Sequence, residues 1–299
     1  MPERGSPLMA EVAVAGATGA LGSTICHALL ARGAAVRALV RDPACGSARA
    51  LADAGADVVR ADLTEPASLA PAVEGAACVV STATCFPRDD AIEAVDRDGN
   101  LALVAAAESA GASRFVFVSF KPVALDFPLQ RAKRAVEERL AQARLDAVIL
   151  RPGKLMDVWF SPVCGFDASV RRATLFGEAT APVTWIAAAD VAEMAARAAN
   201  GEGPRAGTFE LGGPEPLSQR EVVAVYEEAT GAAWVTETLP VAELERMHTH
   251  GESAGIRSLG ALMLEAHLGA TTDPASFHEA FPLRLTTVRE FAGGYSPSG

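Results

Sequence analysis

The sequence has few cysteines and no long apolar run. Its five cysteines are odd in number and none stands in a C-x-x-C pair, which favours free thiols in a reducing compartment over a disulfide framework. No run of about 18 or more uninterrupted apolar residues is present, and the amino terminus lacks a basic segment followed by an apolar one. We therefore expect no membrane partner, no secretory signal and a cytoplasmic location.

Basic charge and aromatic residues are also scarce. The formal net charge of −11 argues against a general nucleic-acid partner, because neutralising phosphates needs a basic face. Aromatic residues are only 6% of a chain that is 50% apolar, so Ala, Val and Leu must fill a sizeable core. These numbers leave a homodimer open.

Two further kinds of chemistry lack support. No G-x-S-x-G segment is present, so nothing indicates the nucleophile elbow of a serine hydrolase. His248-Thr249-His250 is followed by Glu252, but no spaced partner completes the three or four converging ligands that a metal site needs. We expect no metal.

Short apolar segments alternate with helical stretches through the first half of the chain. The helical stretch 23–32 ends at Gly33 and the stretch 91–110 ends at Gly111, a residue type that often follows a helix. This alternation predicts a Rossmann-type α/β fold, with a doubly wound parallel sheet covered on both faces. The expected strands are residues 11–15, 35–40, 57–61, 78–81, 115–119 and 147–150.

A glycine-rich turn joins the first expected strand to the first expected helix. Gly16, Gly19 and Gly22 would allow a tight turn, close approach to a pyrophosphate and close packing of helix on strand. The start of the helix at Ala20 and Leu21 offers unpaired N–H groups to phosphates, and Thr18 offers a hydroxyl. The strand–turn–helix context predicts a dinucleotide site. The alternative is a tight turn without a ligand.

The end of the second expected strand narrows the cofactor to NADP(H). Sites for NAD usually end this strand in an acidic residue, whereas sites for NADP place an Arg nearby. Here Arg41 ends the strand, and a guanidinium can bind a 2′-phosphate through two hydrogen bonds. Arg37 is a second candidate. Because Asp42 follows, NAD(H) is disfavoured but not excluded, and Arg41 as a simple exposed charge is the alternative.

The pattern loosens beyond Leu150, where Arg151-Pro152-Gly153 is expected to break the strand. We expect residues 1–154 to form the NAD(P)-binding domain, rejoined by about 183–213 through strands at 183–186 and 208–211. Residues 155–182 and 214–299 would form a smaller, discontinuous substrate lobe. Asp190 is the expected N-cap of a helix over 190–199, and Ser218 to Glu221 is a capping box. The tail is expected to hold one strand and two or three helices.

These segments together resemble the atypical short-chain dehydrogenase/reductase superfamily, and most of all its NmrA-like branch. That branch includes isoflavone-reductase-like and triphenylmethane-reductase-like enzymes and also NADP-sensing regulators. The resemblance covers about the first 215 residues. The matching segments are residues 16–22, 38–43, 61–63 with 68–69, 116–119, 148–153, 189–192 and 209–213.

The resemblance implies further cofactor contacts just past the strands. Asp62 and Leu63 would flank the adenine ring. Ser81, Thr82 and Ala83 would line the path toward the nicotinamide ribose.

It also implies a catalytic lysine. Lys133 matches the family's active-site lysine, which holds the nicotinamide ribose and assists proton transfer; from the residues alone it is an ordinary solvated helix residue. Ordinary short-chain dehydrogenases place the proton-donating Tyr four residues earlier, where this chain has Leu129, and its only tyrosines, Tyr226 and Tyr295, lie far downstream. Isoflavone-reductase-like members can use the Lys alone, because a general acid needs only a suitable pKa and hydrogen-bond reach. Ser119 would polarise a substrate carbonyl, or else act as a cap or cofactor contact.

We therefore expect an NADPH-dependent oxidoreductase that reduces a small carbonyl, quinone or conjugated substrate. Two alternatives stay open: a non-catalytic NADP(H)-sensing regulator, and an epimerase- or dehydratase-type enzyme, which the missing Tyr disfavours. The substrate pocket is expected from residues 120–127, 155–166 and the tail. Trp159 and Phe160 are expected to wall it, with the core of the smaller lobe as the alternative.

Overall fold

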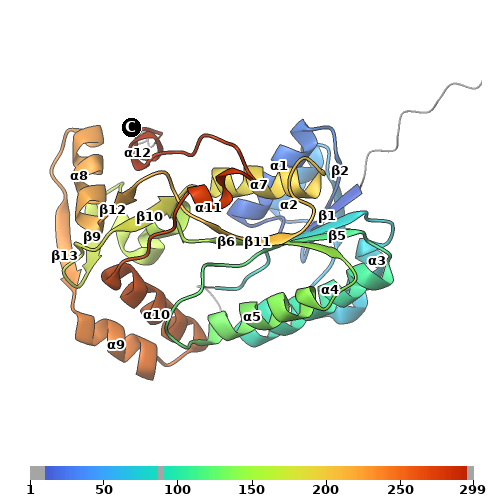
Figure 1. Ribbon diagram of the computed structural model, residues 1–299, viewed down its shortest axis with the longest axis horizontal. Helices are drawn as coiled ribbons and strands as arrows, with labels where there is room; N and C mark the ends of the chain where they lie inside the picture. Colours follow the sequence, from blue (N-terminus) through green and yellow to red (C-terminus); the bar gives the residue numbers. More distant parts are fainter. Residues whose placement is uncertain (1–10, 87–90, 295–299) are drawn as a thin grey trace, which may run out of the picture.

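A seven-stranded parallel sheet forms the centre of the protein (Figure 1). The computed structural model describes residues 11–86 and 91–294. Strand order along the sheet is β11-β6-β5-β4-β1-β2-β3. The direction of winding reverses beside β1, and ligands of such sheets bind at that point, beyond the carboxyl ends of the strands. The strands are β1 (Glu11–Ala15), β2 (Ala35–Val40), β3 (Asp57–Arg60), β4 (Cys78–Ser81), β5 (Arg114–Val118), β6 (Asp146–Pro152) and β11 (Gly207–Leu211).

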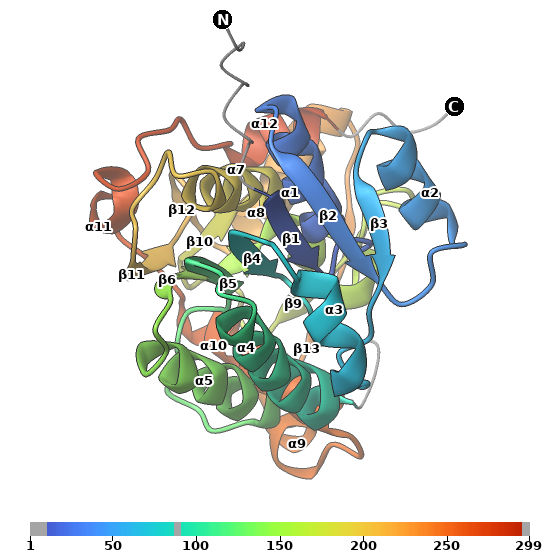
Figure 2. The ribbon, with the colours of Figure 1, turned by 90° about the vertical axis from the view of Figure 1, so that its right-hand side faces the viewer.

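Helices cover both faces of this sheet, as the uninterrupted apolar strands predicted (Figures 1 and 2). One face packs against α1 (Ala20–Ala31), α2 (Gly46–Asp53) and α7 (Ala188–Ala199). The other packs against α3 (Leu69–Val73), α4 (Asn100–Ser109) and α5 (Pro128–Ala141), with the short 3₁₀ turn η1 (Pro66–Ser68) leading into α3. Alternate residues of β1 pack into the apolar cores on the two faces of the sheet, Val12 and Val14 on one face and Ala13 and Ala15 on the other. The Rossmann-type fold is confirmed.

Strand β6 is longer than expected. The strand was predicted to break at Arg151-Pro152-Gly153, but β6 runs through Pro152, whose carbonyl accepts a hydrogen bond from the Lys121 N–H at 3.0 Å. A proline lacks only the donor, so its acceptor can still join a ladder. The break therefore falls at Gly153.

The stretch expected as one helix over 91–110 is two. Residues Ile92–Gly99 form a π-helix, η2, and α4 begins at Asn100. Wider π turns insert an extra residue and are frequent at functional sites. Here they carry the fully buried Asp96 and Asn100 toward β4 and α5.

The smaller lobe holds two three-stranded sheets and its own apolar core. One sheet has the order β12-β10-β7 and the other β13-β9-β8. Its strands are β7 (Lys154–Leu155), β8 (Phe166–Asp167), β9 (Arg172–Phe176), β10 (Val183–Ile186), β12 (Pro216–Leu217) and β13 (Val235–Leu239). The helices of this part of the chain are α6 (Met156–Trp159), η3 (Pro162–Cys164), α8 (Gln219–Thr230), α9 (Val241–His250), α10 (Ala254–Leu268), α11 (Ala275–His278) and α12 (Val288–Gly293).

Of the two strands expected to rejoin the nucleotide-binding domain, one does so and one does not. Helix α7 packs on α1, and β11 pairs with β6 at the edge of the central sheet, as predicted for 208–211. Residues 183–186, predicted to rejoin the same unit, pair instead with β7 and β12 in the smaller lobe. The tail after β13 contains four helices in its described part, not two or three.

One predicted helix cap is confirmed and one is wrong. Ser218 and Glu221 form the expected capping box at the start of α8. Asp190 lies inside α7, whose N-cap is Ala187. Its carboxylate accepts instead from the N–H and hydroxyl of Thr286, at 2.8 and 2.9 Å, and so ties the tail to α7. Burial raises the pKa of Asp190, against the lowering effect of these two bonds.

Within residues 11–86 and 91–294, no helix combines the length and apolar character needed to cross a bilayer.

Candidate functional site

The glycine turn lies where its neighbours leave no room for larger residues. A Cβ on Gly16 would stand 2.7 Å from Thr82 Oγ1 and 2.9 Å from the Ala83 nitrogen, and Gly16 has a φ of +79°. A Cβ on Gly22 would stand 2.2 Å from the Gly16 carbonyl oxygen. These contacts hold the start of α1 tightly against β1 and the segment after β4. The predicted tight turn and the predicted close packing of helix on strand fit the structure.

Helix α1 begins at this turn, and no side chain caps its amino terminus. Its N-cap, Gly19, has no side chain to accept from the first turn, and Ser23 donates the first helical bond, 2.8 Å to the Gly19 carbonyl. No acceptor for the N–H groups of Ala20, Leu21 and Gly22 is found in the described part of the chain. Thr18, Gly19 and Ala20 are exposed. Free N–H groups and the positive end of the helix dipole make this an anion site.

Arg41 lies exposed just past β2, the strand next to β1. Among the described residues no carboxylate lies within ion-pair distance of its guanidinium, so the charge is free to meet a ligand. Arg37, the second candidate, does not share this position. It pairs with Glu11 at 2.6 Å and Asp57 at 3.7 Å, the first residues of β1 and β3, at the amino edge of the sheet.

Asp62 and Leu63 follow β3 at the same edge as Arg41. The Asp62 carboxylate accepts from the Thr64 N–H and hydroxyl, at 2.9 and 2.7 Å. Burial alone would raise the pKa of Asp62, but these bonds and the charges of Arg41 and Arg60 lower it, so the carboxylate stays ionised. Leu63 lies against the end of η2, since a Cβ on Gly99 would stand 2.6 Å from the Leu63 Cβ.

Lys133 is not the solvated helix residue that its charge alone suggests. It lies on the inner face of α5 and is only 4% exposed. Its ammonium stands 3.1 Å from Asp96 Oδ1, donates to the Ala83 carbonyl at 3.2 Å and lies 5.2 Å from the centre of the Phe117 ring. An ammonium has three donors; among the described residues, the Ala83 carbonyl accepts a hydrogen bond from this one and Asp96 Oδ1 forms an ion pair with it.

Asp96 was missed from the sequence and is the buried partner of Lys133. It is 0% exposed. Its second oxygen accepts from the Cys85 N–H at 3.1 Å and from the Cys85 thiol at 3.3 Å. A signal was present: in a helix over 91–110, Asp96 falls on the apolar stripe with Ile92 and Leu103, where an unpaired carboxylate would be costly.

The residues after β4 belong to the same network. Ser81 is fully buried and donates to Asn100 Oδ1 at 2.6 Å, while Asn100 Nδ2 donates to the Val95 carbonyl at 2.9 Å. The Ala83 carbonyl, bound by Lys133, also accepts from Asn100 at 3.4 Å. Ser81 therefore positions the backbone here instead of facing a ligand, and Thr82 hydrogen-bonds the Ala15 carbonyl at 3.3 Å.

Ser119 does not hydrogen-bond Lys133 in the described part of the chain. Its hydroxyl accepts instead from Arg134, the next residue of α5, at 2.8 Å. Arg134 also pairs with Glu137 at 3.0 Å, and Glu137 with Arg151 at 2.5 Å. Burial lowers the pKa of Arg134, although the Glu137 charge opposes this. The catalytic role of Ser119 stays a prediction, with Arg134 as its observed partner.

Leu129 fills the place where a short-chain dehydrogenase has its Tyr. It is buried in the core of the smaller lobe, and its N–H donates to Ser258 of α10 at 3.2 Å. An apolar side chain held there supplies no proton.

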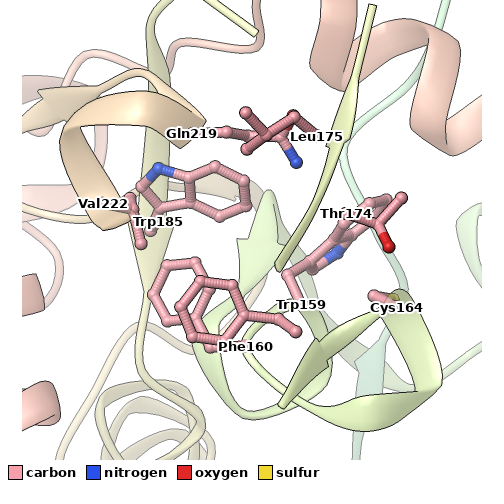
Figure 3. Close-up of a pocket in the computed structure, with 9 residues that line it drawn as sticks. Trp159, Phe160, Cys164, Thr174, Leu175, Trp185, Gln219 and Val222 are labelled. Carbon is pink, nitrogen blue, oxygen red and sulfur yellow. The ribbon is translucent and has the colours of Figure 1, made fainter. Parts of the chain in front are cut away.

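Trp159 and Phe160 pack in the core of the smaller lobe, the alternative that the sequence left open, and they line a small cavity there (Figure 3). Trp159 is 8% exposed and meets Phe176 edge-on at 5.9 Å. Phe160 contacts Trp185 and Tyr226 with ring centres 5.0 and 5.9 Å apart. The cavity that these rings line has a volume of only ≈10 Å³, about the room of one water molecule.

Metal ligands do not gather in the described residues: no group of three or more His, Cys, Asp or Glu side chains is placed to hold an ion.

Comparisons with known proteins agree with this architecture. The chain matches the model of the NmrA-like family over residues 9–292. The photosystem II assembly factor Ycf39 of Synechocystis is 28% identical over 297 residues, which are 95% of this chain and 90% of that protein. The NAD(P)H azoreductase of Xenophilus azovorans is 29% identical over 226 residues, 74% of each chain.

Among solved structures, an NADPH-dependent quinone oxidoreductase of Escherichia coli, crystallised with NADPH, superposes with a TM-score of 0.77. Its sequence is 22% identical, and the match covers 95% of this chain and 99% of that one. At this identity the likeness shows the fold. With the family model matched over nearly the whole described chain, this protein belongs to the NmrA-like family.

Proposed function

We propose that this protein binds NADP(H) at the carboxyl edge of the central sheet and reduces a small, apolar carbonyl, quinone or conjugated compound. The observation that carries the proposal is the convergence of three features at one edge. These are the uncapped helix at the glycine turn, Arg41 with no ion-pair partner among the described residues, and the buried Lys133. Relatives named as NAD(P)H- or NADPH-dependent reductases support it.

Each feature suits one part of the nucleotide. The N–H groups of Ala20, Leu21 and Gly22 would bind the pyrophosphate, at a helix start that Gly16 and Gly22 allow to pack closely on its neighbours. Arg41 would bind the 2′-phosphate that distinguishes NADP(H) from NAD(H). A remaining donor of Lys133 would bind a ribose hydroxyl.

Chemically, the bound reduced nicotinamide supplies a hydride. The chain must supply a proton and keep water out. We propose Lys133 as the proton donor, because its ammonium is held by Asp96 and Ala83 and the position of the usual Tyr carries Leu129. Phe120, stacked 5.8 Å from Phe127 after β5, would form an apolar wall for the substrate.

The test combines binding with turnover. We expect NADPH to bind, and to be oxidised when quinones, aldehydes and enones are added as a panel. Arg41→Glu should weaken NADPH binding far more than NADH binding. Arg205→Glu is the matched control, because Arg205 pairs with Asp146 at the start of β6, at the opposite edge. Equal losses for both nucleotides in Arg41→Glu would show that Arg41 does not bind the 2′-phosphate.

A second candidate is a non-catalytic NADP(H)-sensing regulator. Leu129 in the place of the Tyr favours it, and so does the name of the Synechocystis relative, a photosystem II assembly factor. Tight NADPH binding with no oxidation across the substrate panel would favour this reading over the reductase.

We also propose a reducing, cytoplasmic environment. The cysteines form no disulfide in the described part of the chain, and burial raises the pKa of Cys26, Cys78 and Cys164 to about 12, so these three thiols stay protonated and unreactive. Fractionation of cells that express the tagged protein would test this.

A further inference from the structure

The Lys133–Asp96 pair gives the site its charge balance. Both side chains are almost completely buried, so solvent screens neither charge. Asp96 is the single carboxylate within ion-pair distance of Lys133 among the described residues. The neighbouring Arg97 is engaged elsewhere, with Asp98 at 2.7 Å and Glu93 at 3.5 Å. The pair is therefore an isolated, neutral unit.

This neutrality matters because the two redox forms of the nucleotide differ in charge at the ring. The oxidised nicotinamide is a cation and the reduced ring is neutral. A buried lysine without a counter-charge would repel the oxidised form and leave the binding of the reduced form nearly unaffected, since charges interact strongly where water is excluded.

We propose that Asp96 determines the redox preference of this site, by cancelling the charge of Lys133 so that the oxidised nucleotide is also accepted. The inference rests on the proposed function, which places the nicotinamide next to Lys133. The N–H and the thiol of Cys85 both donate to the Asp96 carboxylate and fix its position. Asp96 itself lies on the π-helix η2.

The ratio of two dissociation constants isolates this effect from ordinary structural damage. Loss of a hydrogen bond or a small shift of the backbone weakens NADP⁺ and NADPH together, so their ratio stays constant. Loss of one buried charge weakens one form relative to the other. We therefore measure Kd for NADP⁺ divided by Kd for NADPH, by calorimetry on the full chain.

Three variants should change this ratio of dissociation constants in three different ways. Asp96→Asn leaves the lysine uncompensated and should raise the ratio about tenfold. Lys133→Met leaves the carboxylate uncompensated and should lower it. The double variant restores neutrality and should return the ratio to within about twofold of the wild type.

The chain offers a matched control in a second buried pair. Lys154 is 3% exposed, pairs with Glu265 at 2.5 Å and lies in the core of the smaller lobe. Glu265→Gln removes a carboxylate from a buried lysine in the same way, and it should leave the ratio unchanged. If Asp96→Asn does not fold, Lys133→Met and the double variant still predict a lowered and a restored ratio.

The outcomes separate the two proposals. Opposite shifts in the single variants, reversed in the double variant, support the assignment. The same ratio in all variants overturns it while the proposed function stands. A wild-type protein that binds neither nucleotide overturns the proposed function and this inference together.

Discussion

Replacing Gly22 by Ala tests the geometry of the glycine turn. The new Cβ would stand 2.2 Å from the Gly16 carbonyl oxygen and 2.9 Å from Thr82 Oγ1. Ordinary contacts begin near 3.4 Å, so the backbone of α1 or of the turn must move by about 1 Å. Overpacking of this kind costs about 1–3 kcal/mol of unfolding free energy. The shift also displaces the N–H groups proposed for the pyrophosphate, so the affinity for NADPH should fall about 100-fold.

Two glycines provide graded controls for this substitution. A Cβ on Gly19 would stand 3.3 Å from the same carbonyl oxygen, so Gly19→Ala needs a displacement of only a few tenths of an ångström. Among the described residues, no atom lies within 4 Å of a Cβ added to Gly293 in α12, so Gly293→Ala should leave both stability and binding close to wild type.

Urea denaturation gives the free energy of unfolding of each variant, and fluorescence titration gives the affinity for NADPH. The expected order of damage is Gly22, then Gly19, then Gly293. If Gly22→Ala unfolds at the wild-type urea concentration and binds NADPH as tightly, the close approach is not real and the reasoning from it is refuted.

Other positions carry predictions of their own. Trp159→Ala should cost about 3–5 kcal/mol of stability, because the side chain lies in the core of the smaller lobe. The affinity for NADPH should change less than twofold. A large loss of affinity at unchanged stability would instead place Trp159 in the nucleotide or substrate site. The ion pair with Arg284, followed by the capping bonds at Thr287, lowers the pKa of Glu290 from 4.5 to about 2. Because this pKa is lower in the folded state, the ionised Glu290 stabilises that state above pH 4.5. The stabilisation is lost as pH falls toward 2. The stability difference between wild type and Glu290→Gln should therefore be present at pH 7 and vanish near pH 2; a difference that does not change with pH in denaturation curves would contradict this.

Much of the fold was predictable because its signals are local. Four strands, those at 11–15, 35–40, 78–81 and 183–186, have the predicted bounds. Each is a short apolar run between turn residues, and such a run is buried wherever the chain places it. The family resemblance singled out Lys133, which charge alone would have assigned to solvent and which the structure buries.

The errors come from contacts between segments far apart in the sequence. Residues 183–186 were correctly read as a strand, but nothing local says which sheet a strand joins. Asp190 looked like a helix cap because its true partner, Thr286, lies 96 positions further along the chain. Trp159 and Phe160 follow a strand end, where a ligand is expected, but rings from later strands and helices pack against them, Phe176 of β9 and Tyr226 of α8 among them.

Asp96 shows what a closer reading of the pattern would have found. A carboxylate on the apolar stripe of one expected helix and a lysine on the apolar stripe of another each predict a buried partner. Together they predict each other. The π turns that bring Asp96 into reach carry no comparable signal in the residues.

Titration of the wild-type protein with NADPH and with NADH tests whether an NADP(H) site lies at the carboxyl edge of the sheet. Because Arg41 can bind the 2′-phosphate, we expect NADPH to bind at least about tenfold more tightly than NADH. Equal affinity for the two nucleotides, or binding of neither, would contradict it.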